Sequence, residues 1–457
     1  MKEEVIIKEE KYKKKKEKKK FKTWEKIFII FNIIFIITCI SFYSYRLVHF
    51  YKKEHAILSD NKLAVFLINQ VVYKGDGLYQ DQEDENYYYY KGKVNNNYVW
   101  YSGRLWRIVN INKDTIKLIT EENQTSLVWG YKQNYNNSYI KEWLTRTDNS
   151  SFLNSLDNYD KTLEKSNYCI DEISEDNITC NEKNEITVGL LSVSEYLLAG
   201  GKNSYLNNNS YWWLINASKD NKAWYVFPEG GINDESFDKN VYYSYGVRPT
   251  ITISNSSIKY SGDGTKNNPY VILNDNAINL SIKSVGSYIK YGNYTWRIQG
   301  QYDNYTKLIM DGVLHIEDKE YTSSYSNTIK YLNNTFSNTL DKENLTSCNF
   351  NNGSFGKNSN YNYKNAFSKK VQHSVGIPSI GELFITDYHN YWLFNSFDNS
   401  NLLQYTINNN GGFFADQVDS LNYVRPVICI NNDLLINDGN GMQTNPYILE
   451  VSNENNN

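Results

Sequence analysis

The sequence predicts an α+β protein in which an N-terminal transmembrane helix precedes two tandem, mostly antiparallel domains. Three observations support this fold class. An uncharged run occupies residues 27–45, and a phrase at 245–272 recurs at 422–449. Segments rich in aromatic and β-branched residues alternate with segments of helical spacing. With 457 residues the chain also exceeds one typical domain, so more than one folded part is expected.

The N-terminus predicts a membrane anchor. Residues 8–26, KEEKYKKKKEKKKFKTWEK, form a basic block, and the run that follows, IFIIFNIIFIITCISFYSY, carries no charge. Its length approaches the roughly 20 residues that cross a bilayer, and no A-x-A cleavage site follows it. We therefore predict a cytoplasmic basic segment at 1–26 and a retained transmembrane anchor at 27–46.

Topology follows from the position of the lysines. They are concentrated before the apolar run, so the positive-inside rule places the N-terminus in the cytoplasm and the rest of the chain outside the cell membrane. In this setting the lysines are expected to hold the topology and contact anionic lipid, and no nucleic-acid partner is predicted. Helical spacing of Leu63, Phe66 and Leu67 then predicts a stem helix within 47–77.

Most of the remaining chain is a duplicated unit, at 78–273 and 276–450. Its landmarks keep their order and nearly keep their spacing in both copies. They pair VWYSGRLWRIVNINKDTIKLIT (99–120) with IKYGNYTWRIQGQYDNYTKLIM (289–310), ITVGLLSVSEYLLAGG (186–201) with HSVGIPSIGELFITDY (373–388), and YWWLINAS (211–218) with YWLFNSFD (391–398). Two copies are too few for a solenoid, so we predict tandem globular domains.

Local patterns assign the elements of the first copy in chain order. Strand-like alternation and turn residues predict a hairpin, followed by a helix, a short Ser-capped helix that ends at Gly-Gly, and three late strands. The corresponding ranges are 99–120, 138–156, 192–201, 211–218, 222–227 and 246–253.

The last of these strands contains the Arg-Pro pair of the repeated phrase. Alternation places Val247 and Ile251 on one face and Arg248 on the other. Arg248 suits a clamp on a carboxylate or sulfate, or it ties its own domain together. The second copy retains the residue as Arg425, which favours the role in folding.

Cysteines predict an oxidised chain. Cys169 and Cys180 bracket a polar, acidic segment, which indicates a short-loop disulfide, whereas Cys348 and Cys429 either pair or stay free. Neither a CxxC motif nor zinc-like ligand spacing is present, so no metal site is predicted. No cofactor motif was recognised.

An aromatic group supplies the candidate ligand site. Flat rings beside amide side chains suit stacking and hydroxyl contacts with sugars, and alternation sends two adjacent tryptophans to opposite faces. The candidate ligand-binding residues are Trp212, Trp213, Asn216, Trp224, Tyr225 and Arg248. Because Trp213 aligns with Leu393, this platform is expected in the first copy alone.

Catalytic patterns are sparse. The motifs HExxH and GxSxG do not occur. His373 or His389 with Cys348 is the one pair that resembles a nucleophile and its base, and loop histidines are usually only solvated. No catalytic residue is predicted.

The landmarks WRI, VGLLSVSEYL, YWW, GVRP and SGDGTKNNPYVI resemble an uncharacterised exported domain repeated in surface proteins of low-GC Firmicutes. That domain is similar to the C-type-lectin-like and formylglycine-generating-enzyme fold group. The resemblance covers most of 78–450 and implies two C-type-lectin-like domains. The enzyme branch also needs late active-site cysteines, which find no match here.

Together these features predict a membrane-anchored cell-surface protein of a low-GC bacterium whose tandem domains bind an extracellular ligand. A glycan or cell-wall polymer is the first expectation, and a surface protein is the second. The alternatives are an exported enzyme acting on cell-wall or sulfated material and a structural surface spacer.

Overall fold

The protein is described by a computed structural model, in which the chain forms two compact units, 1–58 and 59–457. The described residues are 9–13, 26, 28, 30–44 and 63–450, except for 113–114, 131–133, 149–150, 175–176, 237–242, 255–259, 273–277, 357–362, 387–389, 399–400 and 409–410.

In the first unit the described residues are helical, but none of the helices described is both long and apolar enough to cross a membrane. The predicted anchor at 27–46 and the single-pass location with an extracellular C-terminal part are therefore wrong, and the membrane as a partner stays a prediction. The basic segment 1–26 lies largely outside the described residues.

The second unit is mostly β, so the predicted α+β class is also wrong. The predicted helix at 138–156 shows why, because α3 (Tyr139–Thr145) ends early and only a 3₁₀ turn, η2 (Leu153–Ser155), follows. The intervening Thr, Asn, Asp and Ser residues favour turns and caps over helix interior. In the predicted stem, α2 (Leu63–Ile68) is the helix described, and 47–62 lie outside the described residues.

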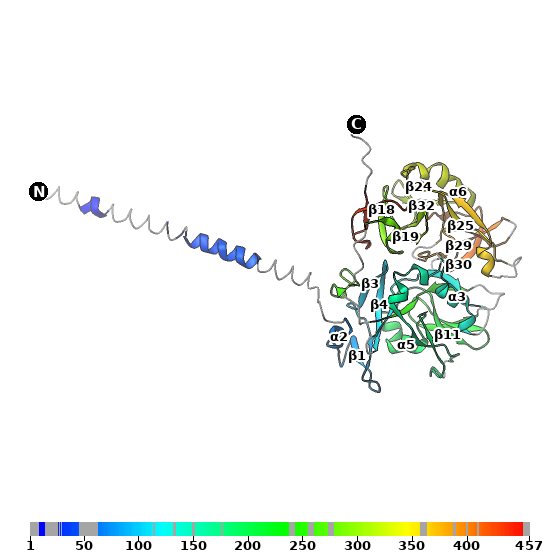
Figure 1. Cartoon of the computed structure of the whole chain (residues 1–457), viewed down its shortest axis with the longest axis horizontal. Coiled ribbons are helices and arrows are strands. Elements are labelled where there is room, and N and C mark those ends of the chain that lie inside the picture. The colour runs from blue at the N-terminus through cyan, green and yellow to red at the C-terminus, as the bar shows by residue number, and fades with distance from the viewer. Residues whose placement is uncertain are drawn as a thin grey trace. The chain divides into compact units, whose positions relative to one another are not determined.

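The first half of this unit contains two sheets and a hairpin (Figure 1). The large sheet has the order β10-β15-β5-β4-β3-β17-β16, with β1, β2 and β7 beside it; its strands are β1 (Gly77–Gln80), β2 (Tyr87–Lys91), β3 (Tyr98–Tyr101), β4 (Arg104–Asn112), β5 (Thr115–Thr120), β7 (Leu163–Glu164), β10 (Val188–Gly189), β15 (Thr250–Ser254), β16 (Tyr260–Ser261) and β17 (Tyr270–Ile272). The small sheet has the order β13-β12-β11-β14-β6, and its strands are β6 (Thr125–Val128), β11 (Trp212–Ser218), β12 (Lys222–Val226), β13 (Ile232–Ser236) and β14 (Ser244–Val247). The hairpin pairs β8 (Ser166–Cys169) with β9 (Lys183–Ile186).

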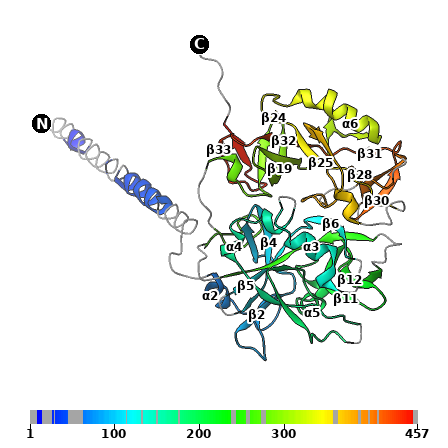
Figure 2. The same cartoon turned by 45° about the vertical axis from the view of Figure 1, so that its right-hand side comes forward.

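The second half repeats this arrangement (Figure 2). Its large sheet has the order β24-β32-β20-β19-β18-β34-β33 with β27 beside β32; its strands are β18 (Tyr288–Tyr291), β19 (Tyr294–Gln301), β20 (Tyr305–Met310), β24 (Leu345–Thr346), β27 (Val375–Gly376), β32 (Val427–Asn431), β33 (Ile436–Asp438) and β34 (Tyr447–Leu449). The smaller pieces are β28 (Trp392–Ser396), β29 (Leu403–Ile407) and β30 (Phe413–Gln417), the pair β23 (Thr322–Ser323) and β31 (Asn422–Tyr423), and the hairpin β25 (Cys348–Asn351) and β26 (Lys370–His373). The pair β21 (His315–Ile316) and β22 (Lys319–Glu320) completes its strands, and its longest described helix is α6 (Tyr325–Asn334).

Strand register aligns the two halves residue by residue. In the first half Thr252 of β15 lies opposite Lys117, and in the second half Cys429 of β32 lies opposite Lys307. The predicted boundaries at 78–273 and 276–450 stay predictions, because both copies belong to the one unit that starts at Ser59.

The same register corrects one sequence alignment. Trp213 Nε1 donates to the carbonyl of Leu127 in β6, and Trp392 Nε1 donates to the carbonyl of Ser323 in β23, the equivalent strand. Trp213 therefore corresponds to Trp392 and not to Leu393. The sequence match was shifted by one residue because both segments contain Tyr-Trp.

The Arg-Pro pair marks a change of sheet. The predicted strand 246–253 is two strands, since β14 ends at Val247 in the small sheet and β15 begins at Thr250 in the large one. Pro249 has no N–H to donate to a ladder, which suits this break. Arg425-Pro426 occupies the same position between β31 and β32.

Direct contacts join the two halves. Arg104 donates to the carbonyl of Val285 at 3.1 Å, and the Thr125 hydroxyl donates to the carbonyl of Glu382 at 2.8 Å. The halves therefore pack against each other in one unit, with each retaining its own sheets.

Candidate functional site

The predicted ligand residues lie inside the first half. Trp212, Trp213, Asn216, Trp224, Tyr225 and Arg248 are all buried, and none exposes more than 7% of its surface. These six residues therefore do not form an aromatic platform that faces solvent.

Their contacts are internal to the fold. Trp224 Nε1 donates to the carbonyl of Ile173 at 3.1 Å. Asn216 accepts a hydrogen bond from the amide of Val193 at 2.9 Å and donates to the carbonyl of Asp171 at 3.1 Å. Asn216 thus ties the loop of the β8–β9 hairpin to the start of α5 (Val193–Leu198).

Arg248 has the structural role that its repetition favoured. Its Nε donates to the carbonyl of Thr120 at 3.0 Å, its Nη1 donates to the carbonyl of Leu206 at 2.5 Å, and the guanidinium lies 4.7 Å from the centre of the Trp212 ring. Burial lowers the pKa of Arg248 to about 10, so the group stays charged at neutral pH. Arg425 makes the equivalent bonds to the carbonyls of Met310 and Phe384.

Two disulfides are present. Cys169 bonds to Cys180, and Cys348 bonds to Cys429, the pairing that the sequence left open. Cys348 does lie opposite His373 in the β25–β26 hairpin. Because its sulfur is held in the disulfide, this pair cannot act as a thiolate nucleophile with its base.

A cavity of about 590 Å³ lies in the second half. Its wall combines the start of α6, the loop of the β25–β26 hairpin, β28, β29 and the residue after β30. The lining residues are Tyr325, Ser326, Asn352, Ser354, Lys369, Phe394, Ser396, Asp398, Asn401, Gln404 and Val418. Hydroxyl and amide groups predominate, with one lysine, one aspartate and two aromatic rings.

Three lining positions are polar here and apolar in the first half. Ser396 and Gln404 form a cross-strand pair between β28 and β29, and the equivalent pair of the first half is Ala217 and Ala223. Asn352 directly follows β25, as Ile170 directly follows β8. The same framework therefore carries a hydrogen-bonding wall in one copy and a packed apolar surface in the other.

A segment that packs on the equivalent strand in the first half has no counterpart among the described residues of the second half. Leu127 corresponds to Ser323, and the helix caps Ser138 and Ser324 correspond, so residues 128–137 are an insertion of the first half. This insertion contributes two fully buried rings, Trp129 and Tyr135. Trp129 Nε1 donates to the carbonyl of Leu214 on β11, the strand equivalent to β28. We infer that its absence leaves the cavity open.

Fixed side chains shape the cavity. Gln404 donates to the carbonyl of Leu393 at 3.0 Å, and the Phe394 ring is held 4.9 Å from that of Phe350. The backbone amide of Asn352 donates to the carbonyl of Lys369 at 2.9 Å across the hairpin loop. Burial raises the pKa of Tyr325 to about 12, so its phenol stays neutral and can donate a hydrogen bond.

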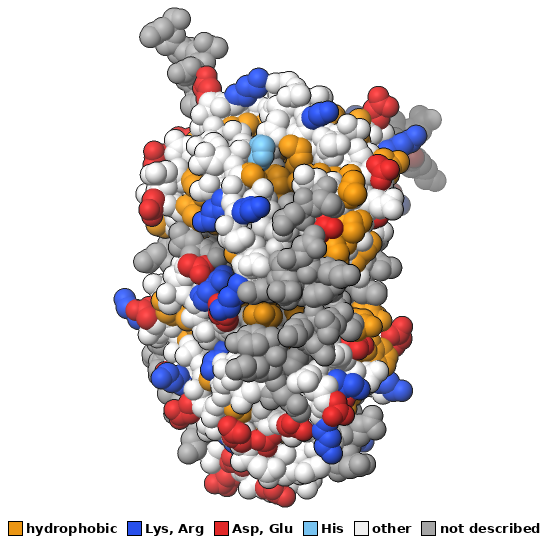
Figure 3. Space-filling view, turned by 90° about the vertical axis from the view of Figure 1, so that its right-hand side faces the viewer, with side chains coloured by type: hydrophobic (Ala, Val, Ile, Leu, Met, Phe, Trp, Pro, Cys, Tyr) orange, Lys and Arg blue, Asp and Glu red, His pale blue; other side chains and the backbone are white. Residues whose placement is uncertain are grey.

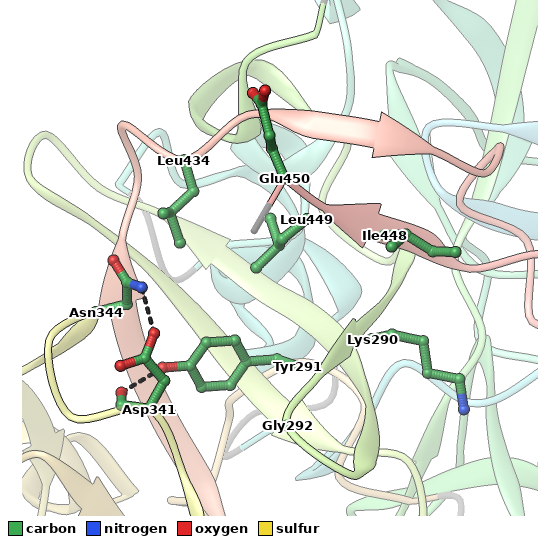
Figure 4. Close-up of a pocket in the computed structure, with 9 residues that line it drawn as sticks. All are labelled: Lys290, Tyr291, Gly292, Asp341, Asn344, Leu434, Ile448, Leu449 and Glu450. Carbon is green, nitrogen blue, oxygen red and sulfur yellow. Dashed lines mark hydrogen bonds between the residues drawn. The ribbon is translucent and has the colours of Figure 1, made fainter. Parts of the chain in front are cut away.

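Figure 4 shows a second, smaller hollow of about 290 Å³ beside β18 and β34. The Tyr291 hydroxyl donates to the carbonyl of Asp341 at 2.6 Å, and Asn344 donates to the Asp341 carboxylate at 2.5 Å. The protein itself thus occupies the main polar groups of this hollow, which makes it the weaker candidate.

A scan against protein-family models, a search of curated proteins and a search of solved structures each found no match to this chain. The chain's own first half is therefore the comparison that is informative for the cavity.

Sequence reasoning missed the cavity. Its signal is the set of apolar-to-polar changes between the copies, together with the insertion at 128–137. Both become readable only once the correct register is known.

Proposed function

We propose that the chain is a binding protein whose second half recognises a neutral, polyhydroxylated ligand such as a glycan in the cavity of about 590 Å³. The observation that supports this proposal most strongly is the replacement of Ile170, Ala217 and Ala223 of the first half by Asn352, Ser396 and Gln404 around that cavity. Polar side chains at positions that one copy packs with apolar residues support a role in binding more than a role in folding.

The size and chemistry of the cavity support a sugar. Ligand pockets typically measure about 300–1,000 Å³ and orient their ligands with a few polar groups. Ring hydroxyls both donate and accept hydrogen bonds, which matches the amide of Gln404 and the hydroxyl of Ser396. The ring of Tyr325, which is partly exposed, offers apolar surface to the face of a sugar.

The charge of the wall supports a neutral ligand. Lys369 and Asp398 balance each other among the lining residues. On the face shown in Figure 3, side chains of both signs are interspersed. A sulfated or phosphorylated polymer would instead favour clustered Arg and Lys. The two disulfides support a protein that folds, and meets its ligand, in an oxidising environment.

Isothermal titration of the full chain with cellotetraose and chitotetraose tests this proposal, with a sulfated tetrasaccharide as the charged comparison. The informative variant is N352I/S396A/Q404A, which gives the cavity the residues of the first half. Lys290→Ala, in the smaller hollow, is the matched control. We expect a neutral probe to bind the wild type and the control and to bind the triple variant at least about tenfold more weakly, a loss of about 1.4 kcal/mol.

Two outcomes would overturn the proposal. One is that neither neutral probe binds the wild type. The other is that the triple variant, folded by circular dichroism, binds as tightly as the wild type.

A further inference from the structure

The disulfide Cys348–Cys429 connects the cavity wall to strand β32 of the large sheet. Cys429 lies in β32, which pairs with β20, β24 and β27, and Cys348 is the first residue of β25. The loop of the β25–β26 hairpin supplies Asn352, Ser354 and Lys369 to the cavity. Both sulfur-bearing residues are buried, so the bond is an internal anchor of this hairpin.

The first half has a hydrogen bond at the same place. Register pairs Glu164 with Thr252 and Thr346 with Cys429, so Ser166, two residues after Glu164, corresponds to Cys348. The Ser166 and Thr252 hydroxyls lie 2.8 Å apart and form a hydrogen bond. The β8–β9 hairpin therefore meets strand β15 without a covalent link at this point.

The disulfide of the first half serves a different segment. Cys169 and Cys180 close the loop within the β8–β9 hairpin itself. The position equivalent to Cys169 is Asn351, at the end of β25. Each copy thus has one disulfide at this hairpin, and only in the second copy does the disulfide join the hairpin to the sheet.

The loops of the two hairpins are supported differently. In the first half the loop lies directly on the small sheet. The backbone amide of Ile173 donates to the carbonyl of Ala217, and the carbonyl of Ile173 accepts a hydrogen bond from Trp224 Nε1. In the second half the cavity lies between the loop and the equivalent strands β28 and β29. Asn395 still donates to the carbonyl of Gly353, at 3.0 Å. A wall that borders a cavity gains less support from packing than one that lies on a sheet.

We propose that the Cys348–Cys429 disulfide positions the hairpin so that Asn352, Ser354 and Lys369 are already arranged for the ligand when the cavity is empty. This inference rests on the proposed function. Preorganisation improves affinity because the entropy of ordering the wall is lost on folding and not on binding. Cys348 and Cys429 are accordingly positioning residues and do not themselves contact the ligand.

The chain supplies its own test variant. C348S/C429T recreates the Ser166 and Thr252 pair of the first half, so a hydrogen bond can replace the disulfide in the same place. We expect titration with the neutral probe, cellotetraose or chitotetraose, to show an affinity about tenfold weaker than that of the wild type. Hydrogen exchange in 348–356 and 363–373 should be faster than in the wild type and should slow again at a saturating probe concentration.

Controls separate positioning from general stability. C169S/C180S removes the other disulfide and should leave the affinity for the probe unchanged. If C348S/C429T does not fold, C348A/C429V fills the same space with apolar groups and is measured in its place.

The outcomes distinguish this inference from the proposed function. An unchanged affinity in a folded variant that lacks the Cys348–Cys429 bond overturns the inference and leaves the proposed function standing. An equal loss of affinity in C169S/C180S also overturns it. No binding of either probe to the wild type overturns the proposed function, and the inference with it.

Discussion

Replacing Lys117 by Met should destabilise the protein strongly at neutral pH. Lys117 Nζ lies 2.5 Å from Glu195 Oε1, and both side chains are largely buried. The carboxylate also accepts hydrogen bonds from the amide and hydroxyl of Ser192, at 3.0 and 2.9 Å. Lys307 and Glu382 form the same pair in the second half, also at 2.5 Å.

The expected loss of stability follows from burial. Breaking a buried ion pair costs about 3–5 kcal/mol, because a charge is left without its partner in a medium that solvates it poorly. The hydrogen bonds from Ser192 continue to stabilise the Glu195 carboxylate, so we expect the lower end, about 3 kcal/mol. In K117M/E195Q no charge remains buried, and the loss should be smaller than in K117M.

The effect should depend on pH with a definite sign. Burial alone would raise the pKa of Glu195, but the Lys117 ammonium and the hydrogen bonds of Lys117 and Ser192 outweigh burial and lower that pKa below its usual value. The pair therefore stabilises the wild type fully above about pH 5, and this contribution is lost as the pH falls through the lowered pKa. In K117M the unpaired carboxyl can be protonated, so the gap between variant and wild type should shrink towards pH 4.

Urea unfolding at pH 7 and pH 4, followed by tryptophan fluorescence, measures these differences in the free energy of unfolding. Three results would contradict the reasoning. K117M could lie within 1 kcal/mol of the wild type at pH 7, its deficit could grow as the pH falls, or K117M/E195Q could be less stable than K117M.

Three further changes test the framework of the first half. Arg248→Met should lower stability by about 2–3 kcal/mol in urea unfolding, since the carbonyls of Thr120 and Leu206 lose their buried donor; a loss below 0.5 kcal/mol would count against its structural role. Trp129→Ala should cost about 3–5 kcal/mol by the same measurement, and a neutral result would mean that the insertion does not fill the space. S166C/T252C should form a disulfide, seen by thiol titration, and raise stability by about 2–4 kcal/mol; unreacted thiols under oxidising conditions would refute the equivalence with Cys348 and Cys429.

Local sequence signals predicted local structure well where residues close together in the sequence determine it. The hairpin predicted over 99–120 is present as β4 and β5, but its first strand is divided, because the chain turns at Ser102-Gly103 and β3 pairs with β4. The short helix predicted after Ser192 is α5, and its capping box with Glu195 is visible in the sequence because the two residues are three positions apart. The break at Arg248-Pro249 was missed, since alternation continues across it in the sequence while the chain changes sheet.

Two larger predictions failed for physical reasons. Hydropathy over 27–45 measures apolar character alone, and none of the helices in the described part of the chain is both long and apolar enough to cross a membrane. The helical spacing at 138–156 overestimated helix content because the Thr, Asn and Ser residues after Thr145 favour turns.

The candidate site could not be predicted from local patterns. Tryptophans 212, 213 and 224 suggested a platform, yet each is buried and two of them donate to backbone carbonyls inside the fold. The cavity instead combines Asn352 with the cross-strand pair Ser396 and Gln404, and Asn352 lies far from that pair in the sequence.

The most direct test of the account is the affinity of N352I/S396A/Q404A for cellotetraose and chitotetraose, measured beside the wild type. We predict that a neutral probe binds the wild type and that the variant, with its fold intact, loses at least about tenfold in affinity. Equal affinity in both proteins, or no binding of either probe by the wild type, would contradict it.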